Sequence, residues 1–171
     1  MTLWNDTAAF IYGRGFWYST VDHHIEDLSD EQLLWVPEPN MLPILWHAGH
    51  IAHRERLHIG RFLQGLVMPV HPPGYDIFGT EWVPAESIAG RLDELGQTPA
   101  DVLGWIGAVR QQSLTYIASL APDDWHRVPE TSELGQTVAE WIWITSCHTA
   151  LHLGRIQMLR NMALGLKDNP C

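Results

Sequence analysis

The sequence predicts an all-α protein built as a four-helix bundle. Long stretches carry apolar residues at helical spacing, and clusters of Pro and Gly separate these stretches from one another. No alternating apolar and polar pattern of useful length indicates a strand. A chain of 171 residues fits one domain, so we expect a single bundle domain over residues 1–171.

The first predicted helix covers residues 3–28, where apolar residues recur at helical spacing and no Pro interrupts them. Ser29 then resembles an N-cap followed by acidic residues, which predicts a short helical turn through Trp35. The second long helix is expected to begin near Pro43, because Pro suits a first helical turn, and to continue to about Leu66.

An irregular connection rich in Pro follows over residues 67–84, and we expect it to cap a pocket of the bundle. The third helical region covers residues 86–120. A break is expected near residues 96–99, because Thr98-Pro99 resembles a capped helix start. Residues 121–136 are expected to form a loop.

The last helix carries the clearest local signals. Thr137 and Glu140 have the capping-box spacing, in which each side chain satisfies a free backbone N–H at the start of a helix. The apolar pattern continues to about Leu164, and Gly165 is a typical C-terminal stop. The sequence therefore predicts a long helix over residues 137–164.

The charge balance excludes some classes of partner. The formal net charge is −10, from 20 acidic and 10 basic residues, and nucleic-acid binding requires a basic surface instead. No apolar run approaches the roughly 18 residues that span a bilayer, and no signal peptide is evident. Two cysteines, one of them the last residue, do not suggest a disulfide framework. We therefore expect a cytoplasmic protein that binds neither nucleic acid nor membrane.

The sequence His148-Thr-Ala-Leu-His152 is the strongest signal for chemistry. Residues four apart lie one above the other on a helix, so the two imidazoles can chelate one cation. Arg155 lies one turn further along the same stripe, and Trp141 lies two turns earlier. Arg155 is expected either to hold an anionic substrate group or to pair with a carboxylate at the end of the bundle.

A second histidine cluster lies on the predicted helix that begins at Pro43. His47, His50 and His53 spread over about 120° of the helix surface, so they cannot all face one point. The middle residue, His50, has the best geometry for facing the bundle axis, and Gly49 would permit a close approach there. We therefore predict that His50, His148 and His152 together bind one divalent metal ion.

Three neutral imidazoles suit Zn²⁺, Ni²⁺, Fe²⁺ or Cu²⁺, and affinity order alone does not choose among these ions. Three protein ligands are also the usual number in a catalytic metal site, where water or substrate takes the remaining position. Thr149 stands where a zinc-protease HExxH motif has its glutamate, so that class of enzyme is excluded.

Other chemically active side chains have simpler interpretations. Lone histidines on amphipathic helices are commonly hydrogen-bonded surface or boundary residues, which is how we interpret His23, His24, His58, His71 and His126. Arg54 and Glu55 are expected to be solvated or paired across the bundle surface. Cys147 is interpreted as a small buried residue. Three tryptophans are candidates to wall a pocket: Trp46, Trp141 and Trp143.

Taken together, the two clusters resemble the DinB-like (YfiT-like) metal-binding bundle superfamily. The resemblance covers nearly the whole chain and includes the segment Leu28 to Leu33 and the motif His148-Thr-Ala-Leu-His152-Leu-Gly-Arg-Ile156. The segment Leu45 to Glu55 is most similar to the DinB-like domain of ergothioneine-type sulfoxide synthases, in which the ligand position maps to His50. Those enzymes also have a large C-terminal domain, so we do not expect a complete sulfoxide synthase here.

The resemblance implies an up-down-down-up bundle, a histidine triad for a divalent cation, and a homodimer. Some relatives are thiol-dependent S-transferases or isomerases, so we expect a metal-dependent enzyme that acts on a small molecule, such as a low-molecular-weight thiol. The alternative is a non-enzymatic module that binds a metal or a small ligand. A third possibility is a bundle, such as a dimerisation unit, whose histidines are only structural.

Overall fold

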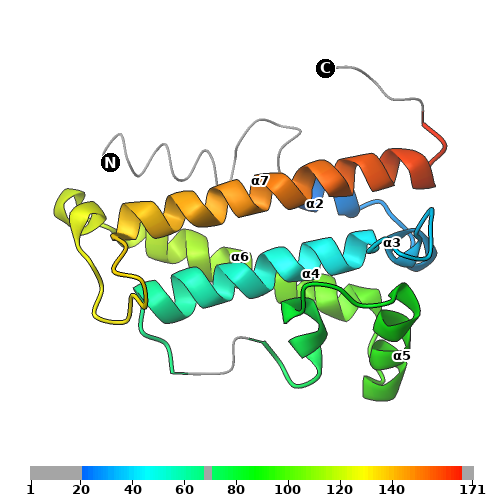
Figure 1. Ribbon diagram of the computed structural model, residues 1–171, viewed down its shortest axis with the longest axis horizontal. Coiled ribbons are helices and arrows are strands. Elements are labelled where there is room, and N and C mark those ends of the chain that lie inside the picture. Colours follow the sequence, from blue (N-terminus) through cyan, green and yellow to red (C-terminus); the bar gives the residue numbers. More distant parts are fainter. Residues whose placement is uncertain (1–20, 68–70, 167–171) are drawn as a thin grey trace.

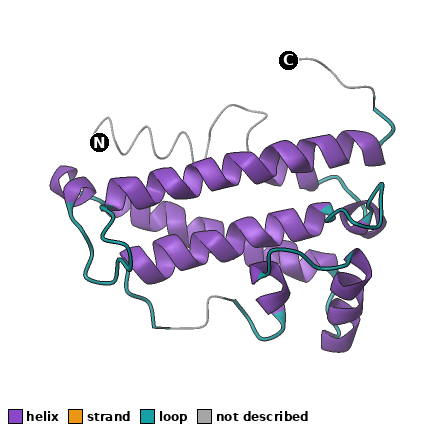
Figure 2. Cartoon of the chain, in the orientation of Figure 1, coloured by secondary structure: helices purple, strands orange, loops and turns teal. Residues whose placement is uncertain are grey.

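The structure is a computed structural model that describes residues 21–67 and 71–166 of the chain. These residues form helices and loops and contain no strand (Figure 2). The predicted all-α fold is therefore confirmed for the described part. Most of the first predicted helix, over residues 3–28, lies outside the described residues, and α2 (Val21–Ile25) lies within its described part.

Three long α-helices form the body of the molecule: α4 (Ile44–Glu55), α6 (Pro99–Ser119) and α7 (Val138–Ala163). α4 continues directly into a π-helical segment, η1 (Arg56–Leu63). The remaining elements are α3 (Asp30–Leu34), α5 (Ala85–Leu95) and two short 3-10 helices, η2 (Tyr75–Gly79) and η3 (Pro122–His126).

α4 packs against both α6 and α7, so it lies at the centre of the described bundle. α4 and α6 run in the same direction, whereas α7 runs antiparallel to both (Figure 1). Fully buried apolar side chains from these helices fill the space between them, including Leu45, Ile51, Val102, Ile156 and Leu159. Residues of α4 and α7 that face this core are consequently held close together.

Three predicted helix starts are confirmed, at Ser29, Thr98 and Thr137. Ser29 and Thr137 each cap a helix with the side-chain oxygen and form complete capping boxes, and Thr98 forms a capping box with Asp101. The predicted break also occurs, because Gly96 ends α5 with a φ of 64° and α6 begins at Pro99. The two regions expected to be irregular contain the 3-10 turns η2 and η3, which are common as short connectors.

A π-helical segment, η1, interrupts the regular α-helical hydrogen bonding of the second long helix. The N–H of Gln64 donates to the carbonyl of Ile59, five residues earlier, at 3.2 Å. A π turn holds more residues than an α turn, so side chains after Glu55 no longer follow the 3.6-residue period. His58, which lies in this segment, is only 8% exposed and its Nδ1 lies 3.0 Å from Thr145 Oγ1 of α7, although we expected it at the surface or boundary.

Several other expectations about burial are wrong. Cys147, expected to be buried, is exposed, and Trp143, a candidate pocket wall, is 63% exposed, because both lie on the outward side of α7. His24, expected at the surface or boundary, is 5% exposed. Glu55 is 1% exposed and forms an ion pair of 3.3 Å with Arg110 of α6 inside the bundle rather than across its surface.

Among the described residues, no helix combines the length and the apolar character that crossing a bilayer requires.

Candidate metal centre

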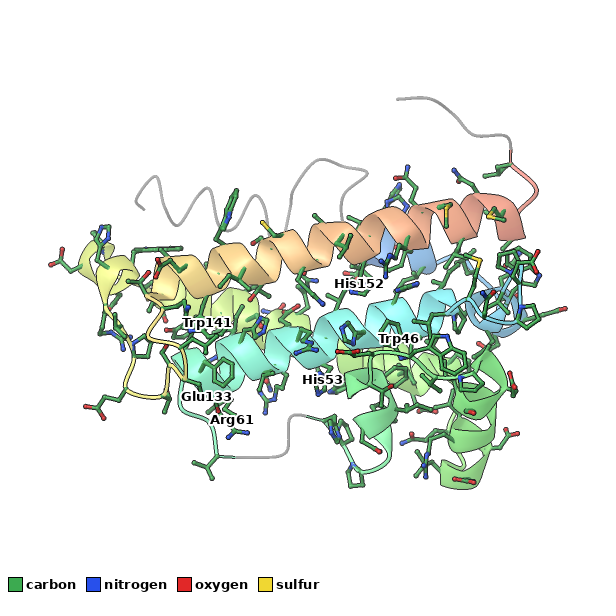
Figure 3. The ribbon with its side chains drawn as sticks, viewed as in Figure 1. Trp46, His53, Arg61, Glu133, Trp141 and His152 are labelled. Atoms are coloured by element: carbon green, nitrogen blue, oxygen red, sulfur yellow. The ribbon has the colours of Figure 1, made fainter. Side chains whose placement is uncertain are left out.

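His50 of α4 and His148 and His152 of α7 converge between the two antiparallel helices. One ring nitrogen from each histidine lies within 4.8 Å of the others, so the three could hold one metal ion. His50 and His152 are 5% exposed, and His148 is partly exposed. Figure 3 shows His152 lying between α7 and α4, not far from Trp46. The structure therefore brings together the three residues that the sequence singled out, and their role as ligands stays a prediction.

A backbone carbonyl fixes the orientation of His50. Its Nδ1–H donates to the carbonyl oxygen of Phe78 in η2 at 2.6 Å, which leaves the lone pair of Nε2 free. Metal-bound histidines commonly donate their other ring N–H in this way. The indole of Trp46 stacks on the imidazole of His50, with ring centroids 4.4 Å apart. The indole Nε1–H of Trp46 donates to the carbonyl of Ile77 at 3.1 Å.

The approach of η2 to α4 depends on Gly49. A Cβ at this position would lie 2.5 Å from Cδ1 of Phe78, a side chain with no solvent exposure. The prediction that Gly49 permits a close approach is therefore consistent with the structure, although the approaching element is the 3-10 helix η2.

His152 is oriented by a fourth histidine, His47, whose role the sequence did not reveal. The Nδ1 atoms of the two residues lie 2.9 Å apart, so one of them donates a proton to the other. When His152 is the donor, its Nε2 keeps a free lone pair. One feature of the sequence could have indicated this role of His47. It lies three residues before His50, so the two side chains are neighbours on one side of a helix.

His148 completes the group from one turn earlier on α7. Its ring centroid lies 4.5 Å from that of His152 and 5.0 Å from that of His50. Its Nδ1 is buried without a hydrogen-bond partner within the described part of the chain. Buried polar atoms are almost always paired, so this nitrogen fits a site in which the imidazole serves a bound ion.

All three imidazoles are held neutral, which is the state that binds a metal. Burial lowers the pKa of His148 to about 4 and that of His152 to about 3, and neighbouring histidines add to both shifts. Burial also lowers the pKa of His50, although the hydrogen bond to Phe78 acts in the opposite direction. At neutral pH the triad therefore offers lone pairs without first losing protons.

The remaining candidate residues are placed elsewhere. His53 faces His71, with ring centroids 5.6 Å apart, whereas His47 and His50 both approach His152. Trp141 packs against His58 and Phe62, with centroid distances of 4.9 and 4.8 Å, in a second apolar cluster. Of the three candidate tryptophans, Trp46 is the one that contacts the triad.

This set of donors defines the chemistry that the site can support. Three neutral imidazoles without a carboxylate or thiolate match the preferences of Zn²⁺ and other late divalent transition metals. Among the described residues, the group that could hold an ion comprises these three histidines and no fourth His, Cys, Asp or Glu. Three protein ligands are typical of sites that leave a position for a further molecule.

Comparison with known proteins gives a family match over most of the chain. A family model described as the DinB superfamily matches residues 17–156, a range that includes all three histidines. None of the curated proteins searched matches the sequence.

Proposed function

Because this chain belongs to the DinB superfamily, we propose that it holds one divalent metal ion on His50, His148 and His152 and acts on a small molecule. The observation that carries the proposal is the convergence of three ring nitrogens from two helices to within 4.8 Å. Zn²⁺, Ni²⁺ and Fe²⁺ are the candidate ions, since each accepts neutral imidazole ligands.

A low-molecular-weight thiol is the proposed substrate, and S-transfer is the proposed reaction. A divalent ion at this site would supply Lewis acidity that lowers the pKa of a nearby thiol. The chain itself presents the ligands in fixed orientations, through Phe78 for His50 and through His47 for His152. In the transfer, the sulfur forms a bond to an electrophilic carbon, the bond from that carbon to its leaving group breaks, and the thiol proton passes to solvent.

The second candidate function is a non-enzymatic module that binds a metal or a small ligand. It uses the same triad, and it would be favoured by a coordination sphere closed by a fourth protein group. Within the described residues the group contains three histidines, which supports the enzyme instead.

Three finer statements also remain proposals. The motif from Leu45 to Glu55 supports a relationship to the DinB-like domain of ergothioneine-type sulfoxide synthases. A homodimer is supported by exposed apolar side chains on α7, among them Trp143 and Leu151, which are 63% and 56% exposed. The cytoplasmic location remains a prediction from the sequence.

Metal analysis of protein purified without chelator tests the metal site. We expect close to one equivalent of a divalent ion in the wild type and a large loss in His152→Ala. His126→Ala, which removes an exposed histidine of η3, is the matched control and should retain the ion. Circular dichroism of each variant separates loss of the site from loss of the fold. Wild-type protein that neither contains nor takes up Zn²⁺, Ni²⁺ or Fe²⁺ would exclude the proposal.

The reaction is tested with metal-loaded protein, a low-molecular-weight thiol and a chloro-aromatic acceptor that releases chloride. Metal-dependent consumption of the thiol that is lost in His152→Ala would support the transferase. A protein that binds metal tightly but leaves a panel of thiols and acceptors unchanged would favour the binding module.

A further inference from the structure

A cavity of about 230 Å³ lies beside the histidine triad, between α4 and α7. The segment before α4 and the segment between η2 and α5 complete its wall. Most of its wall is apolar, from Met41 and Leu42 before α4 and from Met158 and Leu159 on α7. The polar side chains of His47 and Arg155 also line it. Ligand pockets typically combine an apolar lining with a few polar groups, and this volume is below the roughly 300–1,000 Å³ of pockets for drug-sized molecules.

Trp82 forms an exposed wall of this cavity and is held in place. Its side chain is 54% exposed, yet its Nε1–H donates to the carbonyl of Asn40 at 3.3 Å and so joins the two connections that border the cavity. A large aromatic ring fixed at the surface provides a flat apolar face for a ligand at little entropic cost.

The charge at the cavity comes from Arg155. No ion pair of this arginine is found within the described part of the chain, although acidic residues outnumber basic ones by 20 to 10. Its positive charge lies near His47, since after burial it is the largest cause of the lowered pKa of that imidazole. An exposed guanidinium beside an apolar pocket, with no ion-pair partner among the described residues, is suited to a carboxylate, which it can bind through two parallel hydrogen bonds.

We propose that this cavity binds a small organic acid, with the carboxylate on Arg155 and the apolar part against Trp82, Met41 and Leu42. The sequence left two roles open for Arg155, and this cavity favours the binding of an anionic group over a structural ion pair. The binding of the acid depends on the cavity alone and not on a metal.

The cavity is also connected to the triad. His47 lines the cavity, and its Nδ1 lies 2.9 Å from Nδ1 of His152. A ligand in the cavity therefore contacts a residue that orients a member of the triad. This connection rests on the proposed function: an acid in the cavity should change the environment of a metal ion on His152 without being a ligand of that ion.

Hexanoate and its neutral analogue hexanamide test the cavity, because they share size and apolar surface and differ in charge. Calorimetric titration of the full-length chain should show hexanoate binding at least about tenfold more tightly than hexanamide, as expected for a charge-assisted pair. The indole N–H resonance of Trp82, identified by its loss in Trp82→Phe, should shift on addition of hexanoate. Equal affinities for the two compounds, or an unmoved indole resonance, would overturn the proposal.

Arg155→Gln should reduce hexanoate affinity about tenfold or more and leave hexanamide unaffected. Arg91→Gln is the matched control, since Arg91 is an exposed arginine on α5 that pairs with Glu94 at 3.1 Å, away from the cavity. Hexanoate binding that is equally strong in Arg155→Gln and Arg91→Gln would contradict the proposed role of Arg155. Both titrations are done with chelator-treated and with zinc-loaded protein, and binding is expected in both.

The absorption bands of the cobalt-loaded protein test the connection to the triad. Hexanoate should change these bands in the wild type and not in Arg155→Gln. If hexanoate changes the bands equally in both proteins, the acid binds the ion directly and the inference fails. If cobalt does not bind at all, the proposed metal site fails while the calorimetric test of the cavity still stands.

Discussion

The Nδ1–H of His50 donates to the carbonyl oxygen of Phe78 at 2.6 Å, so a main-chain atom of η2 orients an imidazole of α4. The two residues can meet because Gly49 has no side chain: a Cβ there would lie 2.5 Å from the ring of Phe78. The orientation of a candidate metal ligand is thus coupled to the packing of a neighbouring glycine.

Gly49→Ala should destabilise the protein and weaken the metal site. The buried ring of Phe78 must move to admit the methyl group, and overpacking of this kind costs about 1–3 kcal/mol. The carbonyl of Phe78 would move with the ring, so zinc affinity should also fall. Urea unfolding of the metal-free protein and zinc titration measure the two effects separately.

Gly90→Ala is the control for this substitution. Gly90 also lies within a helix, α5, but a Cβ there would have no atom within 4 Å. The change should stabilise the protein by roughly 0.5–1 kcal/mol, because Ala is the better helix former. Similar changes in unfolding free energy for Gly49→Ala and Gly90→Ala would show that the ring of Phe78 does not pack tightly against Gly49.

Replacing His47 should weaken metal binding without a matching loss of stability. His47→Leu removes the partner of His152 Nδ1, and loss of such a partner typically reduces metal affinity about 10- to 100-fold. His47→Asn can place a polar atom near the lost Nδ1 and should recover part of the affinity. A competition titration with a chromophoric zinc chelator measures the affinities, and thermal unfolding without metal reports any structural effect. Equal affinities in the Leu and Asn variants would argue against an orienting role.

The parts of the site that could be predicted from sequence depend on local periodicity. Thr137 and Glu140 establish the start of α7, and a regular α-helix then places His148 and His152 on one face. The same reasoning over the regular helix α4 favours His50 among its neighbours. The structure brings these three imidazoles together, because hydrogen bonds between nearby residues determine the geometry of each helix.

The parts that could not be predicted depend on distant or irregular backbone. The partner of His50 is a carbonyl 28 residues away, and a carbonyl has no signature in the sequence. The partner of buried His58 is Thr145, 87 residues away, and no residue pattern predicts the π-helical segment that contains His58. α7 is apolar on more than one side, so its sequence does not reveal that Trp143 and Cys147 face outward while Trp141 faces inward.

Glu55→Gln should destabilise the protein far more than an equivalent change at the surface. Glu55 is 1% exposed and pairs with Arg110, so the variant leaves a largely buried guanidinium without its counter-charge. Breaking a buried pair costs roughly 3–5 kcal/mol, and the lower end is expected because Arg110 is 15% exposed. Glu94→Gln breaks the exposed pair with Arg91 and should cost less than about 1 kcal/mol. Urea unfolding measures the loss of unfolding free energy in each variant. Equal losses in Glu55→Gln and Glu94→Gln would show that the buried ion pair is no more important for stability than the exposed one.

The stability of the metal-free protein should fall as the pH decreases from 6.5 toward 4, in part because of His58. Its Nδ1–H donates to Thr145 Oγ1 at 3.0 Å, since that hydroxyl donates its own proton to the carbonyl of Trp141. Burial lowers the pKa of His58 from 6.5 to about 4, and the positive charge of Arg54 adds to the shift.

Between these two pH values the unfolded chain binds a proton at this position and the folded chain does not. The free energy of unfolding therefore rises with pH in this window, by up to about 1.4 kcal/mol per pH unit for one such group. The stability that neutral His58 contributes is fully present above pH 6.5 and is lost as the pH falls through about 4.

His58→Asn keeps a donor near Thr145 but cannot take up a proton, so its unfolding free energy should depend less steeply on pH. Urea unfolding in the presence of chelator at several pH values measures the slope, with exposed His126→Asn as the control that should match the wild type. An unchanged slope in His58→Asn would show that another buried group is responsible for the loss of stability in acid.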